Sequence, residues 1–159
     1  MKTQRKSLMA NAVISLLFCF AIVFWSFQVF GQEWTAEQKE IWEVVVADWE
    51  LLKQGNLEMP NRHDNATVWL SNKMFPFGGK FMREAYKRWL DWDKLLAFEL
   101  EPLDIGIYGN VATVFYREKW NGRIMSDRAR TMETWVKQDN KWLLIGRFSA
   151  SCDKIPPCK

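Results

Sequence analysis

Residues 97–151 read AFELEPLDIGIYGNVATVFYREKWNGRIMSDRARTMETWVKQDNKWLLIGRFSAS. Apolar and polar residues alternate along most of this stretch, which is the pattern of strands that bury one face. Turn-forming residues interrupt the alternation three times, at Gly109-Asn110, Asn121-Gly122 and Asp139-Asn140. The stretch therefore predicts an antiparallel meander of four strands, over residues 97–108, 111–120, 126–137 and 141–151.

Helices are predicted upstream of the meander. Thr35 and Gln38 form a capping box, and apolar residues at helical spacing follow until Gly55, where the helix is expected to end. A short helix capped by Asp64 and a second long helix from Lys80 come next. The predicted fold is α+β: a cone-shaped, curved antiparallel sheet wrapped over a long N-terminal helix, with two further helices.

The N-terminus has the character of an export signal. Lys2, Arg5 and Lys6 precede an apolar run from Leu8 to Phe30, and a small residue, Gly31, follows the run. We predict a signal peptide over residues 1–31, and a secreted or periplasmic domain over residues 32–159. In the alternative interpretation the run, which is long enough to span a bilayer, is retained as a single membrane anchor.

The charge of the predicted domain is balanced. The chain has 22 Lys and Arg against 19 Asp and Glu, and its three excess positive charges all lie in residues 1–31. The remaining 19 basic residues equal the acidic ones, so the domain has no electrostatic preference for nucleic acid. A membrane is an expected partner only if the apolar run is retained.

Two cysteines lie near the C-terminus. Cys152 and Cys158 are an even pair in a terminal loop, which in an oxidising compartment predicts a disulfide, with free thiols as the alternative. A metal site would need further ligands nearby, and His63 is the one histidine of the chain. No metal site is predicted. The sequence also has no phosphate-binding loop and no dinucleotide fingerprint, so no cofactor is expected.

Aromatic residues are abundant in residues 32–159, which contain nine of the ten tryptophans. Buried rings can build the core of a small domain, or they can line a pocket for an apolar or aromatic ligand. The side chains predicted to bind such a ligand are Trp49, Trp69, Tyr86, Trp89, Tyr116, Trp135 and Arg147.

The strand alternation also places polar groups inside the cone. Glu118, Glu133 and Arg147 share the predicted inner face with Tyr116 and Trp135. A carboxyl group in an apolar cavity has a raised pKa suited to proton transfer, and an arginine can hold an anionic group. Glu118 and Glu133 are therefore candidate catalytic residues, and a cross-strand ion pair without a function is the alternative.

His63 and Asp64 are a further candidate pair. A carboxylate beside an imidazole can set its tautomer and raise its basicity, as a general base requires. Adjacent residues need not touch, however, and a helix cap or a surface position explains Asp64 equally well.

The order and spacing of several motifs resemble a known family. The motifs are GNVATV at 109–114, TMETWVK at 131–137, NKWLLI at 140–145, and His63 ahead of WLSN at 69–72. Together they resemble the SnoaL-like branch of the nuclear transport factor 2-like superfamily, which implies a cone fold. That superfamily includes isomerases, cyclases and dehydratases, beside members that only bind or associate. Dehydratase-type sites use paired histidines, whereas this chain has one histidine, and Arg147 stands where relatives often have another.

Three functions remain open from the sequence. The first is binding of a small apolar or aromatic molecule in a conical pocket. The second is a cofactor-independent isomerase, cyclase or dehydratase that uses a pocket carboxylate and Arg147. The third is a non-enzymatic module that forms a homodimer through the outer sheet face, where Arg117 and Lys119 are expected to lie.

Overall fold

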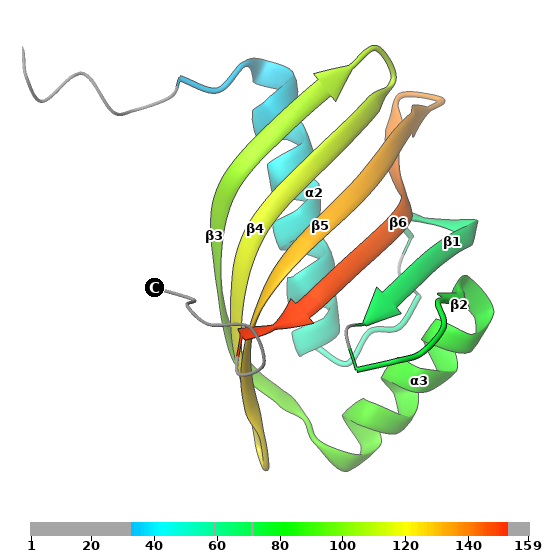
Figure 1. Ribbon diagram of the computed structural model, residues 1–159, viewed down its shortest axis with the longest axis vertical. Helices are drawn as coiled ribbons and strands as arrows, with labels where there is room; N and C mark the ends of the chain where they lie inside the picture. The colour runs from blue at the N-terminus through cyan, green and yellow to red at the C-terminus, as the bar shows by residue number, and fades with distance from the viewer. Residues whose placement is uncertain (1–32, 59, 71, 153–159) are drawn as a thin grey trace, which may run out of the picture. The chain divides into compact units, whose positions relative to one another are not determined.

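The C-terminal stretch forms four consecutive antiparallel strands in the computed structural model, which describes residues 33–58, 60–70 and 72–152. The strands are β3 (Leu95–Tyr108), β4 (Val111–Gly122), β5 (Ser126–Gln138) and β6 (Lys141–Ser151). They begin and end within two residues of the predicted bounds, and the curved α+β architecture is confirmed (Figure 1). Gly109, Asp139 and Asn140 have positive φ angles of 63°, 50° and 58°, as tight hairpin turns require.

One expected element is different. Residues 62–70 form a strand, β1 (Arg62–Leu70), and not a short helix; β1 pairs parallel with β6 and antiparallel with a two-residue strand, β2 (Phe77–Gly78). The sheet order is β2-β1-β6-β5-β4-β3, so one of its pairings is parallel. Ala66 and Val68 are buried while Thr67 is exposed, a period-two pattern that pairing with β6 stabilises over the local cap signal of Asp64.

The first helix, α2 (Ala36–Lys53), lies against the inner face of the sheet (Figure 1). Its predicted capping box is present, with both hydrogen bonds between Thr35 and Gln38. The buried stripe of the helix consists of Ile41, Val45, Trp49 and Leu52. Gln38 Nε2 also donates to the Ile105 carbonyl at 2.7 Å, which ties the start of the helix to β3.

The second helix, α3 (Gly79–Trp92), packs against β1 and buries Met82. Asp93, directly after it, is fully buried and accepts hydrogen bonds from the amides of Ile124 and Met125 at 2.7 and 3.0 Å. A Cβ atom at Gly122 would overlap this carboxylate, so glycine is required there. The end of α3 is thereby joined to the β4–β5 turn.

Two irregularities in the sheet set the direction of the side chains at its centre. On β6, Gly146 pairs with Thr134 but Leu144 pairs with Trp135, so Ile145 is an extra, bulged residue. Leu143 therefore faces the opposite side of the sheet from Arg147, although strict alternation would place the two side chains on one face. On β1, the register with β6 also shifts between Arg62 and Thr67.

Several predicted features lie outside the described residues. The apolar run of residues 8–30 is one of them, so the export signal and its alternative, a membrane anchor, stay predictions. Cys158 is another, and the disulfide with Cys152 stays a prediction as well. Among the residues that are described, no helix is both long enough and apolar enough to cross a bilayer.

Candidate functional site

Three of the predicted polar residues meet on the inner face of the sheet. Arg147 Nη2 on β6 lies 2.7 Å from Glu118 Oε2 on β4, and Arg147 Nη1 lies 3.5 Å from Glu133 Oε1 on β5. The three side chains are only 9 %, 5 % and 4 % exposed. One arginine thus bridges two buried carboxylates from different strands. Removing any one of the three side chains would leave a buried charge without its partner, which is strongly destabilising.

Each carboxylate has further hydrogen-bond donors. Glu133 accepts from the Tyr116 hydroxyl at 2.9 Å and from Trp135 Nε1 at 3.1 Å, and Trp49 Nε1 lies 3.4 Å from the same hydroxyl. Trp135 and Tyr116 are buried, so their polar ends need such partners. The predicted aromatic residues Tyr116, Trp135 and Trp49 therefore surround Glu133.

Glu118 lies in a second, hydroxyl-rich environment. Thr131 Oγ1 donates to Glu118 Oε2 at 2.9 Å and lies 3.0 Å from Ser149 Oγ, which is 3.4 Å from Glu118 Oε1. Thr131 and Ser149 are both buried. These contacts hold Glu118 as the partner of Arg147; Glu118 is not among the residues that line the pocket described next, whereas Glu133 is.

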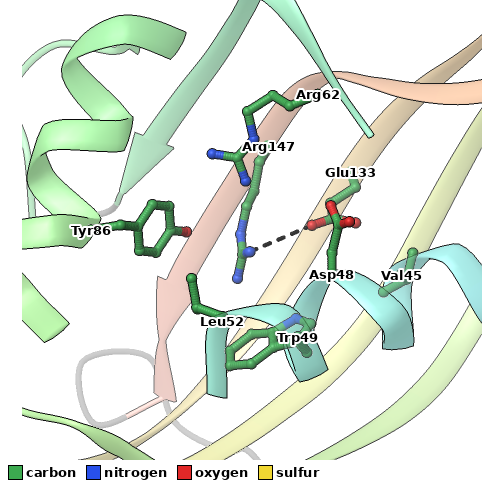
Figure 2. Close-up of a pocket in the computed structure, with 8 residues that line it drawn as sticks. All are labelled: Val45, Asp48, Trp49, Leu52, Arg62, Tyr86, Glu133 and Arg147. Carbon is green, nitrogen blue, oxygen red and sulfur yellow. Dashed lines mark ion pairs between the residues drawn. The ribbon is translucent and has the colours of Figure 1, made fainter. Parts of the chain in front are cut away.

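The pocket lies beside this network, between α2, α3, β1 and the inner face of the sheet (Figure 2). It encloses about 330 Å³ of empty space, including its open mouth. The residues that line it are Val45, Asp48, Trp49, Leu52, Arg62, Tyr86, Glu133 and Arg147. Half of these side chains carry a formal charge, so the lining is far more polar than the predicted site for an apolar ligand.

Figure 2 shows how the pocket is built. Tyr86 points into it from α3, Asp48 and Glu133 lie together on the opposite side, and Arg62 reaches in from β1. The enclosed part of the space is narrow and has room for about one or two water molecules. In this conformation the pocket suits a compact polar group.

Arg62 has buried donors without a partner. Its Nε and Nη1 atoms are buried and make no hydrogen bond, and its Cζ lies 5.5 Å from the centre of the Tyr86 ring. Burial lowers the pKa of the guanidinium below its usual value. Buried donors are normally satisfied, so those of Arg62 are available to an acceptor that enters the pocket.

The two carboxyl groups of the pocket have raised pKa values. Burial raises the pKa of Glu133, and Arg147 and Tyr116 only partly oppose this effect. Burial likewise raises the pKa of Asp48, although Asn61 Nδ2 donates to its Oδ1 at 2.9 Å. A carboxyl group with a raised pKa can give up or accept a proton closer to neutral pH than an exposed one.

Other predicted site residues lie elsewhere. Trp89 packs edge-on against Tyr86 and Trp120, with ring centres 6.2 and 5.2 Å apart, and is not part of the pocket lining. Trp69 is 45 % exposed and packs edge-on against Phe148.

The candidate pair His63 and Asp64 is not brought to the pocket either. His63 Nδ1 accepts a hydrogen bond from the Asn65 amide within the irregular part of β1, and Asp64 is exposed. Arg62, directly before His63, is the residue of this segment that lines the pocket. Sequence reasoning missed Arg62 because a short helix was expected here, and its position depends on the register of β1 against β6.

Asp48, on α2, also lines the pocket, and the side-chain amide of Asn61 donates a hydrogen bond to its carboxylate. Its position one residue before Trp49, at the border of the buried stripe, is the signal that could have placed it there.

The outer face of the sheet carries the expected charges. Arg117 lies 2.9 Å from Glu101, and Lys119 lies 3.0 Å from Glu99. A row of half-exposed apolar side chains in cross-strand register crosses the same face: Phe115, Met132, Phe148 and Trp69. The homodimer predicted through this face stays a prediction.

The described residues offer no obvious metal site. Over residues 33–58, 60–70 and 72–152, no three His, Cys, Asp or Glu side chains gather as ligands for an ion. In the pocket, the acids lie beside two arginines, which compete with any cation for the carboxylate oxygens.

Comparisons with known proteins identify the fold. No protein-family model matches the chain, and no curated protein is significantly similar to it. Solved structures are similar: an NTF2-like protein from Cytophaga hutchinsonii has a TM-score of 0.64 at 15 % identity, with 74 % of this chain and 99 % of that chain covered. An NTF2-like protein of unknown function from Pseudomonas putida KT2440 has a TM-score of 0.64 at 14 % identity, with 74 % and 87 % covered.

A third similar structure is a protein of unknown function with a cystatin-like fold from Nostoc punctiforme. It has a TM-score of 0.59 at 20 % identity, with 79 % of this chain and 98 % of that chain covered. The described domain therefore has the NTF2-like fold that the resemblance implied. At these identities the likeness extends to the fold alone, and the SnoaL-like branch stays a prediction.

Proposed function

We propose that this NTF2-like domain binds a compact polar molecule whose carbonyl or carboxylate oxygen is held by Arg62 in the pocket. The observation that carries the proposal is the pair of buried, unpartnered guanidinium nitrogens of Arg62. A ligand oxygen would supply the hydrogen bonds that the protein itself does not make. Since hydrogen bonds to charged groups contribute about 1.5–3 kcal/mol each, this interaction is large enough to select a ligand.

The lining changes the ligand class expected from the sequence. Trp135 and Tyr116, predicted to bind an apolar or aromatic molecule, are 1 % and 0 % exposed and pack within the core. The Arg62 guanidinium lies beside the Tyr86 ring, and Asp48 is on the side of the pocket opposite Tyr86 (Figure 2). The carboxylate of Asp48 can accept a hydrogen bond from a hydroxyl group of the ligand. The favoured class is a small hydroxy- or oxo-acid.

Arg62→Met should weaken binding of such acids at least tenfold, because each lost charge-assisted hydrogen bond is worth about that factor or more. The probes are acetate, glycolate, pyruvate and the neutral acetamide, each titrated by isothermal calorimetry into the wild type and the variants. Arg128→Met, at an exposed position on β5, is the matched control and should bind like the wild type. Equal affinity of Arg62→Met and the wild type for every probe would contradict the proposal.

A second candidate function is proton transfer next to a carbonyl group. It is favoured by Asp48 and Glu133, whose carboxyl groups both line the pocket and have raised pKa values because of burial. Arg62 would hold the carbonyl or enolate oxygen while one carboxylate removes the neighbouring proton. This step is common to isomerisation, aldol-type cyclisation and dehydration, so it can be tested before the substrate is known.

The test is hydrogen exchange of pyruvate, acetoacetate and acetone in D₂O, followed by proton NMR. The wild type should accelerate loss of the signal next to the carbonyl by at least a hundredfold over buffer, the usual contribution of a general base. Asp48→Asn or Glu133→Gln should remove most of the acceleration. Glu43→Gln, at an exposed position on α2, should leave the rate unchanged. Exchange at the buffer rate with all three probes would exclude this chemistry for them.

A further inference from the structure

The segment that joins β1 to β2 carries large apolar side chains on the surface. Met74 and Phe75 are 81 % and 72 % exposed. The segment is held at its start, because the Lys73 amide donates to the Leu70 carbonyl at 2.9 Å and Trp69 Nε1 donates to the Lys73 carbonyl at 3.0 Å. Two adjacent apolar side chains are thus presented to solvent from an anchored turn.

One exposed ring on α3 packs against the end of this segment. Phe81 is 52 % exposed and packs edge-on against Phe77, with ring centres 5.3 Å apart. The Arg88 guanidinium lies 5.6 Å from the centre of the Phe81 ring. We call Lys73, Met74, Phe75, Phe81 and Arg88 the β1–β2 patch. It combines exposed apolar side chains with flanking basic ones.

The sequence around the patch is mostly basic. Residues 65–90 contain Lys73, Lys80, Arg83, Lys87 and Arg88 against one acidic residue, Glu84, although acidic and basic residues balance over residues 32–159. Exposed bulky apolar groups flanked by Lys and Arg are typical of surfaces that lie in the headgroup region of an anionic bilayer. The apolar run from Leu8 to Phe30 supports such a surface in the interpretation in which it is retained as an anchor, because an anchor keeps the domain beside a bilayer.

We propose that the β1–β2 patch docks the domain on an anionic membrane surface. Met74 and Phe75 enter the interface between headgroups and acyl chains, while Lys73 and Arg88 meet lipid phosphates. The stems of the basic side chains can lie along the apolar surface with their charges at the phosphates. This proposal does not depend on the ligand of the pocket.

The test is hydrogen–deuterium exchange of the full chain, reconstituted in vesicles of phosphatidylcholine alone or with 30 % phosphatidylglycerol. The full chain is used because it includes the apolar run of residues 8–30. That run is expected to bind lipid by itself, so the exchange of the patch residues is measured and not the binding of the whole chain. Amide exchange of residues 72–82 should slow at least threefold in the anionic vesicles and not in the neutral ones. Residues 106–112, at the β3–β4 turn, should exchange equally in both.

Met74→Ser/Phe75→Ser should abolish the slowing in anionic vesicles. Tyr108→Ser removes a side chain that is 69 % exposed outside the patch and is the matched control, which should keep the slowing. Equal exchange of residues 72–82 in both kinds of vesicle would overturn the proposal. Slowing that grows with protein concentration in lipid-free detergent would also overturn it, since a second copy of the chain would then cover the patch.

Discussion

Arg147→Met is expected to lower the free energy of unfolding by about 3–5 kcal/mol, the usual cost of removing one partner from a buried ion pair. The methionine leaves Glu118 and Glu133 buried without their cation, although each keeps its neutral donors. For a domain of this size the melting temperature should fall by about 10 °C or more. Urea denaturation followed by tryptophan fluorescence measures the change.

Two further variants separate this effect from the loss of an arginine in general. Arg117→Met breaks an exposed pair with Glu101 on the outer face, where the partners are 37 % and 60 % exposed, and should cost less than about 1 kcal/mol. Arg147→Met/Glu118→Gln/Glu133→Gln removes the unpaired charges and should recover more than half of the lost stability. If Arg147→Met costs no more than Arg117→Met, the buried network is not formed as described.

Trp135→Ala is the second large effect, with an expected loss of about 3–5 kcal/mol from the cavity that replaces a buried indole. Trp135 is 1 % exposed, and its Nε1 donates to Glu133 Oε2 at 3.1 Å. Trp135→Phe keeps much of the volume and removes this hydrogen bond, so it should cost about 1–3 kcal/mol. Thermal and urea denaturation give both values.

The matched control is Trp92→Ala, at a position that is 52 % exposed, which should change the stability by less than about 0.5 kcal/mol. The comparison decides between the two roles considered for the aromatic residues. A side chain that only lines a ligand site costs little stability when it is truncated, whereas a core side chain costs several kcal/mol. If Trp135→Ala lowers the stability only slightly, Trp135 belongs with the side chains that line a ligand site and not with the core.

The C-terminal sheet was predictable because its information is local. Period-two alternation and turn residues such as Asp139 and Asn140 specify each strand and hairpin without reference to distant residues. The same alternation placed Glu118 and Glu133 on the inner face, where the structure finds them. The capping box of Thr35 and Gln38 marked the start of α2 for the same reason.

The segment around His63 shows where local signals fail. A cap residue before an apolar pair predicted a short helix, but β1 is stabilised by pairing with β6, which lies about 80 residues further along the chain. No short-range pattern contains that pairing. It places Arg62 in the pocket, and it leaves His63 and Asp64, a further candidate pair for a general base, outside the pocket lining.

The sequence by itself thus determined the α+β architecture, the strand bounds and the inner face of β4 and β5. The tertiary structure decided which of these groups meet. The bulge at Ile145 puts Arg147 opposite Glu133 on the inner face of the sheet. The irregular register of β1 places Arg62 in the lining of the pocket. Residues 143–145 are all apolar, so alternation could not locate the extra residue. A bulge is settled by pairing between strands, because one inserted residue reverses the direction of every side chain after it.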